Sequence, residues 1–282
     1  ARSDARFRVI PTNREGIVAA LNLGLVEARG ALVARMDADD WMHRDRLAAQ
    51  SSALEADPTL AGVGCHVRMF PRRRMSDGLR AYECWLNGID TARAVVAEAF
   101  VECPLAHPSL LLRVEVAKSL GYRDAPWPED YDFVLRALQA GHRLGVVPRR
   151  LLGWRQNHGG LSRRDPRYSQ QRFTACKAKF LTTGLLRGRD RYTLWGYGAT
   201  GRALAKELSR FGRHPKYIVE LHPGRLGQQI AGAPVISPDA LPPRSEAGPL
   251  IASVAGSEAR RRIRTHLLAR GYRENEDYVC AA

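Results

Sequence analysis

Residues 31–40 read Ala-Leu-Val-Ala-Arg-Met-Asp-Ala-Asp-Asp and place a short, mostly apolar run directly before three carboxylates. A run of this length that ends in polar residues predicts a buried strand over 31–36. Asp37 and Asp39 then lie where the strand ends, the position at which α/β folds keep their ligand sites. We therefore predict an α/β protein with a polar site at this strand end.

One residue separates Asp37 from Asp39, so their carboxylates can converge on a single divalent cation. Mg²⁺ and Mn²⁺ prefer such oxygen ligands and leave further positions to water and substrate phosphate. The sequence predicts that Asp39 and Asp37 bind Mg²⁺ or Mn²⁺, with Asp37 as a second contact for a nucleotide. The alternative is that Asp39 or Asp40 only caps a helix suggested by residues 47–54.

A second acidic cluster, Glu129-Asp130, lies about ninety residues further along. Apolar residues at helical spacing over 133–138 predict a helix that begins at this cluster, and Gly141 predicts its end. A helix N-terminus favours ionised carboxylates, so Asp130 is expected to stay ionised at neutral pH and to accept a proton. Asp132 is the next candidate for that role, and a purely structural cap is the alternative for the whole cluster.

The order of these motifs resembles the family 2 glycosyltransferases of the GT-A fold, from about residue 7 to about residue 165. The segments that carry the resemblance are 16–24, similar to the helix before the metal strand; 34–40, the metal motif; 107–109 and 121–122; 129–136, the acceptor-site helix; and 154–162, the terminal loop. Coincidence does not explain so many motifs in family order.

The resemblance implies inverting transfer of a sugar from a nucleotide-sugar donor to a hydroxyl of a glycan or lipid-linked acceptor, in bacterial surface polysaccharide or glycolipid synthesis. Asp130 would accept the acceptor proton and Glu129 would orient the site. The cation on Asp39 would stabilise the departing diphosphate. Arg155 and His158 would close over the same phosphates, or else belong to a solvated loop.

One departure from the family pattern concerns the beginning of the chain. The family normally starts with about two further strand and helix units that hold the nucleotide base, whereas 36 residues precede Asp37 here. We therefore expect a GT-A type mixed or parallel sheet that is incomplete at the N-terminus, in a fragment of a longer enzyme. Residues 7–10 are expected to form an inherited internal strand, and donor affinity is expected to suffer from the missing units.

A glycine-rich turn opens the C-terminal part of the chain. The strand expected over 192–195 runs into Gly196-x-Gly198-x-x-Gly201, and helical spacing follows. Glycines at this spacing permit a tight turn and a close approach of phosphate to a helix N-terminus. Glu220, at the end of the next expected strand, is then placed to meet a ribose. This part resembles the small Rossmann-like domains appended to some bacterial sugar transferases, with a nucleotide or sugar-nucleotide ligand and a purely structural or docking role as the alternatives.

We predict three parts: a glycosyltransferase domain over 1–165, a basic helical linker over 166–189, and a Rossmann-like βαβ domain over 190–282. Two alternatives to transferase function are a degenerate nucleotide-binding regulatory protein and a nucleotide-sugar oxidoreductase or epimerase run by the C-terminal domain. No Tyr-x-x-x-Lys-like pair follows the glycine motif, which disfavours the oxidoreductase.

The net charge of +15 is concentrated in one segment. Residues 143–191 hold 13 Lys and Arg against 2 Asp and Glu, an excess of +11. Such a field would attract anionic diphosphates or an anionic membrane surface, unless the segment is simply a solvated linker. The segment has few aromatic residues and no recognition module, so we expect no nucleic-acid partner.

Cysteine usage and hydropathy indicate in which cellular compartment the protein is expected. The five cysteines are scattered and show no C-x-x-C spacing, which argues against a disulfide framework and a structural zinc site. No apolar run approaches the roughly 18 residues that span a bilayer, and no secretory leader is visible, although a truncated start could hide one. The sequence predicts a cytoplasmic protein, with peripheral contact at the inner face of the cell membrane as an option.

Overall fold

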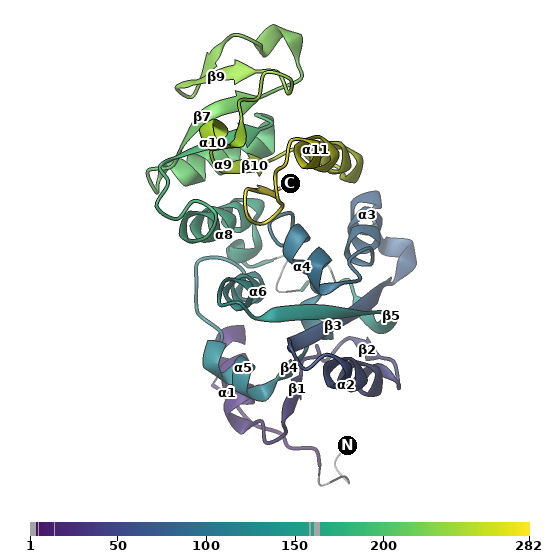
Figure 1. Ribbon diagram of the computed structural model, residues 1–282. Helices are drawn as coiled ribbons and strands as arrows, with labels where there is room; N and C mark the ends of the chain where they lie inside the picture. Colours follow the sequence, from purple (N-terminus) through teal and green to yellow (C-terminus); the bar gives the residue numbers. More distant parts are fainter. Residues whose placement is uncertain (1–3, 5, 14, 158, 161–163) are drawn as a thin grey trace.

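Two sheets of different construction are stacked one above the other in the computed structural model (Figure 1). The structure describes residues 4, 6–13, 15–157, 159–160 and 164–282. The first sheet is mixed and has five strands, and the second has six strands and is mainly parallel. The predicted α/β class, with a second and smaller unit, is therefore confirmed.

The first sheet has the order β1-β4-β3-β5-β2. Its strands are β1 (Leu32–Ala34), β2 (Trp41–Met42), β3 (Leu60–Phe70), β4 (Leu111–Arg113) and β5 (Arg143–Arg155). The two long strands β3 and β5 run parallel at its centre, and the other neighbouring pairs are antiparallel. The carboxyl ends of β3 and β5 consequently meet at one edge, beside β2.

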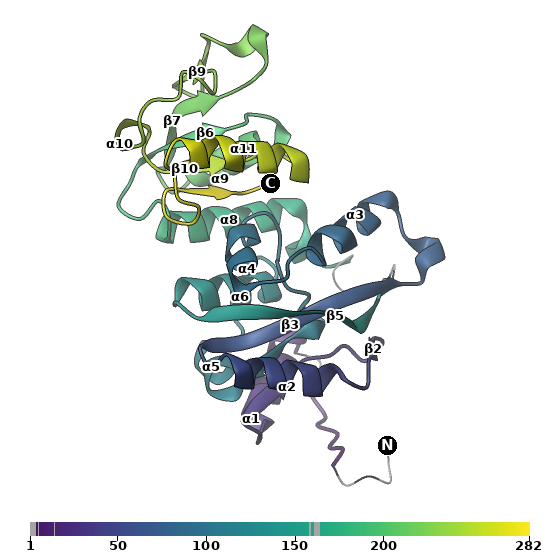
Figure 2. The ribbon, with the colours of Figure 1, turned by 45° about the vertical axis from the view of Figure 1, so that its right-hand side comes forward.

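Helices cover both faces of this sheet. They are α1 (Ile17–Glu27), α2 (Arg46–Ala56), α3 (Asp77–Leu86), α4 (Ala92–Glu98), α5 (Val114–Leu120) and α6 (Glu129–Gln139). The views show α1, α2 and α5 on one side of the long strands and α3, α4 and α6 on the other (Figure 2). Buried apolar side chains fill the two layers between sheet and helices.

Two expectations about strands are wrong. The strand predicted over 31–36 is β1, which is shorter than predicted and only half-buried, because it lies at the sheet edge and pairs with β4 alone. Residues 7–10 pair with no strand among the described residues, and the Val9 side chain is 93% exposed. An extended segment without a strand partner gains no ladder of hydrogen bonds, so it does not form a strand.

The helix predictions agree better with the structure. The helix suggested over 47–54 is α2, and the helix suggested at Glu129 is α6, which is followed by Gly141 at a φ of 84°. Because the residue before α2 is Asp45, neither Asp39 nor Asp40 caps this helix. The structural alternative for the first acidic cluster is therefore excluded.

Helix α8 (Gln170–Thr183) lies between the two sheets and contributes to both hydrophobic cores (Figure 1). Its residues in the first core are Phe173, Cys176 and Phe180, and those in the second are Ala178 and Leu181. The buried Lys177 Nζ donates hydrogen bonds to the carbonyls of Val101, at 2.7 Å, and Ala281, at 3.4 Å. The segment 166–189 is thus a packed element, and we keep 1–165, 166–189 and 190–282 as proposed boundaries.

The second sheet has the order β11-β10-β6-β7-β9-β8. Its elements are β6 (Arg191–Trp195), α9 (Ala199–Ser209), β7 (His214–Val219), β8 (Gln229–Ile230), β9 (Ala233–Ile236), α10 (Arg244–Ala247), β10 (Leu250–Ala252), α11 (Ser257–Ala269) and β11 (Tyr278–Cys280). All neighbouring pairs are parallel except β8 with β9. No helix in the described ranges is both long and apolar enough to cross a membrane.

Candidate active site

Both acidic clusters line a single cavity of about 240 Å³. The lining includes Asp37 and Asp39 from the loop after β1, Glu129 and Asp130 from the start of α6, and Arg155 from the end of β5. These five predicted site residues come from three separate parts of the chain. The fold therefore brings together the two acidic clusters, which the sequence predicted as a metal site and as a proton acceptor.

A buried arginine fixes the loop that carries the first cluster. The Arg46 side chain is fully buried in α2 and donates to the carbonyl of Arg35 at 2.9 Å and to Gln50 Oε1 at 3.0 Å. Gln50 in turn donates to the carbonyl of Ser109 at 2.8 Å. Buried polar groups need such partners, so this pair ties α2 to both loops that border the cavity.

The three aspartates of the first cluster have different surroundings. Arg35 holds both oxygens of Asp37 at 2.7 Å. Asp40 Oδ1 accepts a hydrogen bond from the Arg155 amide at 2.7 Å, and burial raises the pKa of Asp40 to about 6. The Asp39 carboxylate is exposed and has no partner among the described residues. Asp39 is therefore the carboxylate of this cluster that the protein leaves available.

The donor set fits one kind of cation. Among the described residues there is no group of three or more His, Cys, Asp or Glu side chains arranged around a metal. Asp39 and Asp37 together supply two oxygen-bearing side chains that face the cavity. This set fits Mg²⁺ or Mn²⁺, which keep water and substrate phosphates as their other ligands, and does not fit a closed structural zinc site.

The second cluster is anchored at the start of α6. Glu129 is 2% exposed, and one of its oxygens accepts a hydrogen bond from the Tyr168 hydroxyl at 2.6 Å. Asp130 Oδ1 accepts from the Tyr131 amide at 2.7 Å. Burial, followed by the charge of Glu129, raises the pKa of Asp130 to about 7. The expectation that Asp130 is fully ionised at neutral pH is therefore wrong, because desolvation outweighs the helix N-terminus.

Asp132 is excluded as the second candidate for proton acceptance. Its fully buried carboxylate accepts from Arg123 at 2.9 Å, Trp127 at 3.0 Å and Arg136 at 2.7 Å. Burial alone would raise the pKa of Asp132, but these donors together lower it. Asp132 does not line the cavity and acts as an ion-pair anchor of α6.

Two segments that the resemblance singled out meet at the cavity, which His107 and Pro108 line. The His107 Nε2 lies 2.8 Å from the Tyr122 hydroxyl, and burial lowers the pKa of His107 well below its ordinary value. The Tyr122 ring stacks on Phe133 of α6 at 4.7 Å. The Asn22 side chain, in α1, is hydrogen-bonded to both the amide and the carbonyl of Tyr122 at 2.8 Å. These contacts position α6 rather than contribute to chemistry.

Arg155 borders the cavity on the side of the first cluster. Its Nε donates to the carbonyl of Asp39 at 2.7 Å, and its guanidinium lies 4.6 Å from the centre of the Phe70 ring. His158, which the sequence paired with Arg155, lies outside the described residues. Arg35 and Tyr168 also line the cavity, and sequence reasoning gave neither of them a role. The available signals were an arginine directly before the acidic motif and a tyrosine after the turn at Asp165.

A second predicted site lies at the carboxyl ends of the parallel strands. A cavity of about 590 Å³ is lined by Gly196, Glu220 and Val254, which follow β6, β7 and β10, together with residues of α11. Because β6 is flanked by β7 on one side and β10 on the other, the strand order reverses at this place. Open parallel sheets bind ligands at such a reversal.

The glycines of this region serve different purposes. Gly196 has a φ of 92°, and a Cβ there would lie 2.4 Å from a methyl of Val254. A Cβ on Gly201 would lie 2.1 Å from the carbonyl oxygen of Gly196, whereas one on Gly198 would meet no atom within 4 Å. Gly198 and Gly201 do not line the cavity. Gly196 and Gly201 are thus accounted for by close packing of α9 on β6.

Glu220 is oriented by the protein itself. Its Oε1 accepts from the Tyr197 amide at 2.7 Å and from Arg225 at 3.1 Å. Glu220 therefore stabilises the glycine turn, and its expected contact with a ribose stays a prediction.

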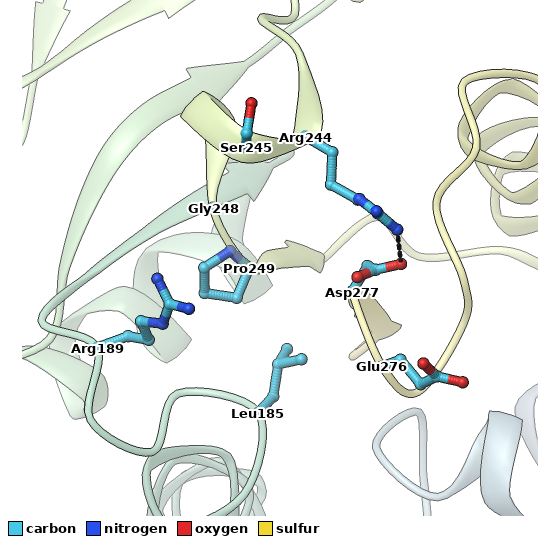
Figure 3. Close-up of a pocket in the computed structure, with 8 residues that line it drawn as sticks. All are labelled: Leu185, Arg189, Arg244, Ser245, Gly248, Pro249, Glu276 and Asp277. Atoms are coloured by element: carbon cyan, nitrogen blue, oxygen red, sulfur yellow. Dashed lines mark hydrogen bonds and ion pairs between the residues drawn. The ribbon is translucent and has the colours of Figure 1, made fainter.

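A cavity of about 520 Å³ lies at the opposite end of the same sheet, where Arg189, Pro249 and Asp277 precede β6, β10 and β11 (Figure 3). Arg244 spans its rim and pairs with Asp277 at 2.9 Å. None of the predicted site residues lines it. Its volume therefore does not make it the site of the predicted chemistry.

Comparison with known proteins gives one family and several partial likenesses. Residues 1–121 match the sequence model of Glycosyl transferase family 2. The chain is 28% identical over 185 residues to the amylovoran biosynthesis glycosyltransferase AmsE of Erwinia amylovora, which covers 64% of this chain and 67% of AmsE. The matched family region includes the first acidic cluster and ends before α6.

Solved structures with partial likeness include two glycan-related proteins. One is S. aureus TarS 1–349 in complex with UDP-GlcNAc, at 14% identity and a TM-score of 0.43 over 67% of this chain and 51% of that one. Another is the mannosyltransferase PcManGT of Pyrobaculum calidifontis in complex with GDP-Man and Mn²⁺, at 23% identity and a TM-score of 0.39 over 61% and 43%. The chain spans about half the length of these solved structures.

Proposed function

We propose that the chain is a glycosyltransferase of family 2 type, which moves a sugar from a nucleotide-sugar donor to a hydroxyl acceptor with inversion; the match of residues 1–121 to the family model supports this proposal. By analogy with AmsE, we place this transfer in polysaccharide biosynthesis. The observation that carries the proposal is the shared cavity, which is lined both by Asp39, in the loop after β1, and by Asp130, at the start of α6.

The proposed step is a single displacement. The acceptor oxygen forms a bond to the anomeric carbon as the bond from that carbon to the diphosphate breaks, and the hydroxyl proton passes to Asp130. A base with a pKa near the working pH is suited to this task, since it is partly ionised and still basic. The pKa of Asp130, raised to about 7 by burial and by the charge of Glu129, meets that requirement.

Other residues hold the reacting groups in place. Tyr168 fixes Glu129 through its 2.6 Å hydrogen bond, so the charge beside Asp130 has a defined position. Arg155 and Arg35 line the cavity next to the first cluster and present cationic groups to a diphosphate. Arginine suits this role because its planar guanidinium binds phosphate oxygens bidentately.

A divalent cation would be held by Asp39, with Asp37 beside it. When bound, the cation supplies Lewis-acid stabilisation of the charge on the departing diphosphate, an effect of several kcal/mol. Asp37 is already held by Arg35, so we propose that Asp37 orients the loop and that Asp39 is the principal ligand.

We also infer that the cavity at Gly196 and Glu220 takes a nucleotide or sugar nucleotide, because it lies where the strand order of the parallel sheet reverses. The polar side chains on its α11 side are those of Glu258, Arg262 and His266. This site is independent of the transferase proposal, and neither requires the other.

The transferase proposal is tested by donor hydrolysis and transfer, measured on a panel of nucleotide sugars with Mg²⁺, with Mn²⁺ and with chelator. We expect turnover only with a divalent cation and a loss of at least about 100-fold in Asp39→Asn, as for other groups that stabilise developing charge. The matched control is Asp90→Asn, which removes an exposed carboxylate outside the cavity. Turnover that survives both chelator and Asp39→Asn would overturn the metal assignment.

A further inference from the structure

A groove of about 520 Å³ adjoins the cavity of Asp130 and has no part in the proposed step. We call it the Trp41 groove, and it is lined by Trp41, Arg68, Phe70, Arg150, Gly153 and Arg155. It lies over the ends of β2, β3 and β5, the strands that carry these residues. Arg155 lines both the groove and the cavity, so the two spaces border the same side chain.

The groove exposes aromatic surface that the fold does not need. Trp41 is 58% exposed although tryptophan is among the most apolar residues, and its ring is held edge-on to His43 at 5.8 Å. Gly153 stands opposite Trp41 in the strand pair, and a Cβ there would lie 3.3 Å from both Trp41 and Phe70, so the glycine lets the two aromatic side chains lie close to the strand. Exposed apolar surface of this kind marks a binding groove.

The rim of the groove is cationic. Arg68, Arg150 and Arg155 are all exposed. Within the described ranges, none of their guanidinium groups is paired with a carboxylate, and the only side-chain bond among them joins Arg155 Nε to the carbonyl of Asp39. By contrast, Arg35, Arg123 and Arg136 around the same site all pair with aspartates. Arg68 and Arg150, which have no carboxylate partner among the described residues, thus place two guanidinium groups in the groove of one exposed aromatic ring, a combination that suits an anionic ligand.

We propose that the Trp41 groove binds the acceptor, and that this acceptor is an acidic saccharide. A sugar ring lies against Trp41, its carboxylate is held by Arg68 and Arg150, and the reacting hydroxyl passes Arg155 to reach Asp130. The proposal rests on the transferase function for the identity of the ligand as an acceptor. It adds the substrate class, and it explains why charge and aromatic surface occur together at this edge of the sheet.

The test measures binding without any donor. The whole chain is titrated calorimetrically with two oligosaccharides of equal length, one a neutral glucan and the other a galacturonan. We expect the galacturonan to bind and the glucan to bind at least about 10-fold more weakly. The double variant Arg68→Gln/Arg150→Gln should weaken galacturonan binding by about 10- to 100-fold, as expected for the loss of charge-assisted hydrogen bonds.

Three further variants keep the test specific. Arg187→Gln removes an exposed arginine before β6 and should leave binding unchanged. Arg68→Lys keeps the charge and loses the planar fork, so its affinity should fall between those of the parent and of Arg68→Gln. Trp41→Ala should weaken the binding of both oligosaccharides, and a melting temperature close to that of the parent would confirm that the fold is intact.

The outcomes separate the groove from the transferase proposal. Equal binding of both oligosaccharides, or galacturonan binding that is unchanged in the double variant, would overturn the proposal. Binding to phosphatidylglycerol vesicles through Arg68 and Arg150, without binding of galacturonan, would also overturn it in favour of a membrane surface. Galacturonan binding that is lost in the double variant supports the groove, even if no nucleotide sugar is turned over and the transferase proposal fails.

Discussion

The two regions that sequence motifs marked as sites differ in what the fold leaves unexplained. In the C-terminal unit, Gly201 packs on the Gly196 carbonyl and Glu220 binds the Tyr197 amide, so packing accounts for these residues of the motif and leaves Gly198 without a structural role. In the N-terminal cavity, desolvation raises the pKa of the half-buried Asp130 to about 7, and Asp40 Oδ2 is buried with no partner among the described residues. A carboxyl group with a raised pKa and a buried oxygen without a partner both destabilise the fold, and such groups are typical of functional sites.

This difference predicts that Asp130→Asn separates activity from stability. The asparagine keeps the shape of the side chain and cannot accept the proton, so transfer should fall by about 10² to 10⁴. The free energy of unfolding should stay level or rise, because a buried carboxylate is removed. Steady-state transfer and denaturant unfolding measure the two quantities, with Asp90→Asn as the control. Transfer at the parent rate would require another base.

Asp132→Asn should show the opposite pattern two residues away. It breaks the buried pairs with Arg123 and Arg136, and removing one partner of a buried ion pair costs about 3–5 kcal/mol of unfolding free energy. Because the pKa of Asp132 is lowered in the fold, its contribution is present at neutral pH and is lost as the pH falls through that lowered value. Unfolding of Asp132→Asn that matches the parent would contradict the anchoring role.

The glycine turn offers a matched pair of substitutions. Gly201→Ala forces a Cβ against the Gly196 carbonyl and should cost about 1–3 kcal/mol of stability. Gly198→Ala meets open space at a φ of −71° and should change stability by less than about 1 kcal/mol. Thermal unfolding of both variants, followed by calorimetry of Gly198→Ala against nucleotides, tells packing from binding. If Gly198→Ala is stable and loses a nucleotide that the parent binds, the turn has a ligand as well as a structural role.

As the pH rises toward 7, activity should increase while the contribution of Asp130 to stability decreases. With the pKa of Asp130 raised to about 7, kcat/KM should rise about tenfold per pH unit below 7 and level off above it. Between about pH 4 and 7 this group binds a proton in the folded protein and not in the unfolded chain, so its contribution to stability declines as the pH rises. The pH dependence of kcat/KM and that of stability should both disappear in Asp130→Asn. If kcat/KM of the parent instead rises with a midpoint near pH 4, Asp130 is not desolvated.

The local sequence pattern predicted those helices and strands whose formation depends on residues nearby in the sequence. The helices at Arg46 and Glu129 and the strands and helix of the C-terminal unit follow from apolar spacing, glycine and turn residues. The expected strand over 7–10 failed, because a strand depends on a partner from elsewhere in the chain. The expected ionisation of Asp130 failed for a similar reason, since the desolvation that raises its pKa comes from the folded chain around it and cannot be deduced from the acidic motif alone.

The amino-acid sequence by itself determined which groups can carry the chemistry: carboxylates at Asp39 and Asp130, and a glycine turn at Gly196. Only the tertiary structure decided that Asp39 and Asp130 share a cavity and that Asp132 is paired with two arginines. It also decided that Arg68 and Arg150 line the same groove as Trp41, with no carboxylate partner among the described residues. The physical reason is that a side chain's charge, pKa and availability depend on the distance to groups far away in the sequence, and those distances exist only in the folded chain.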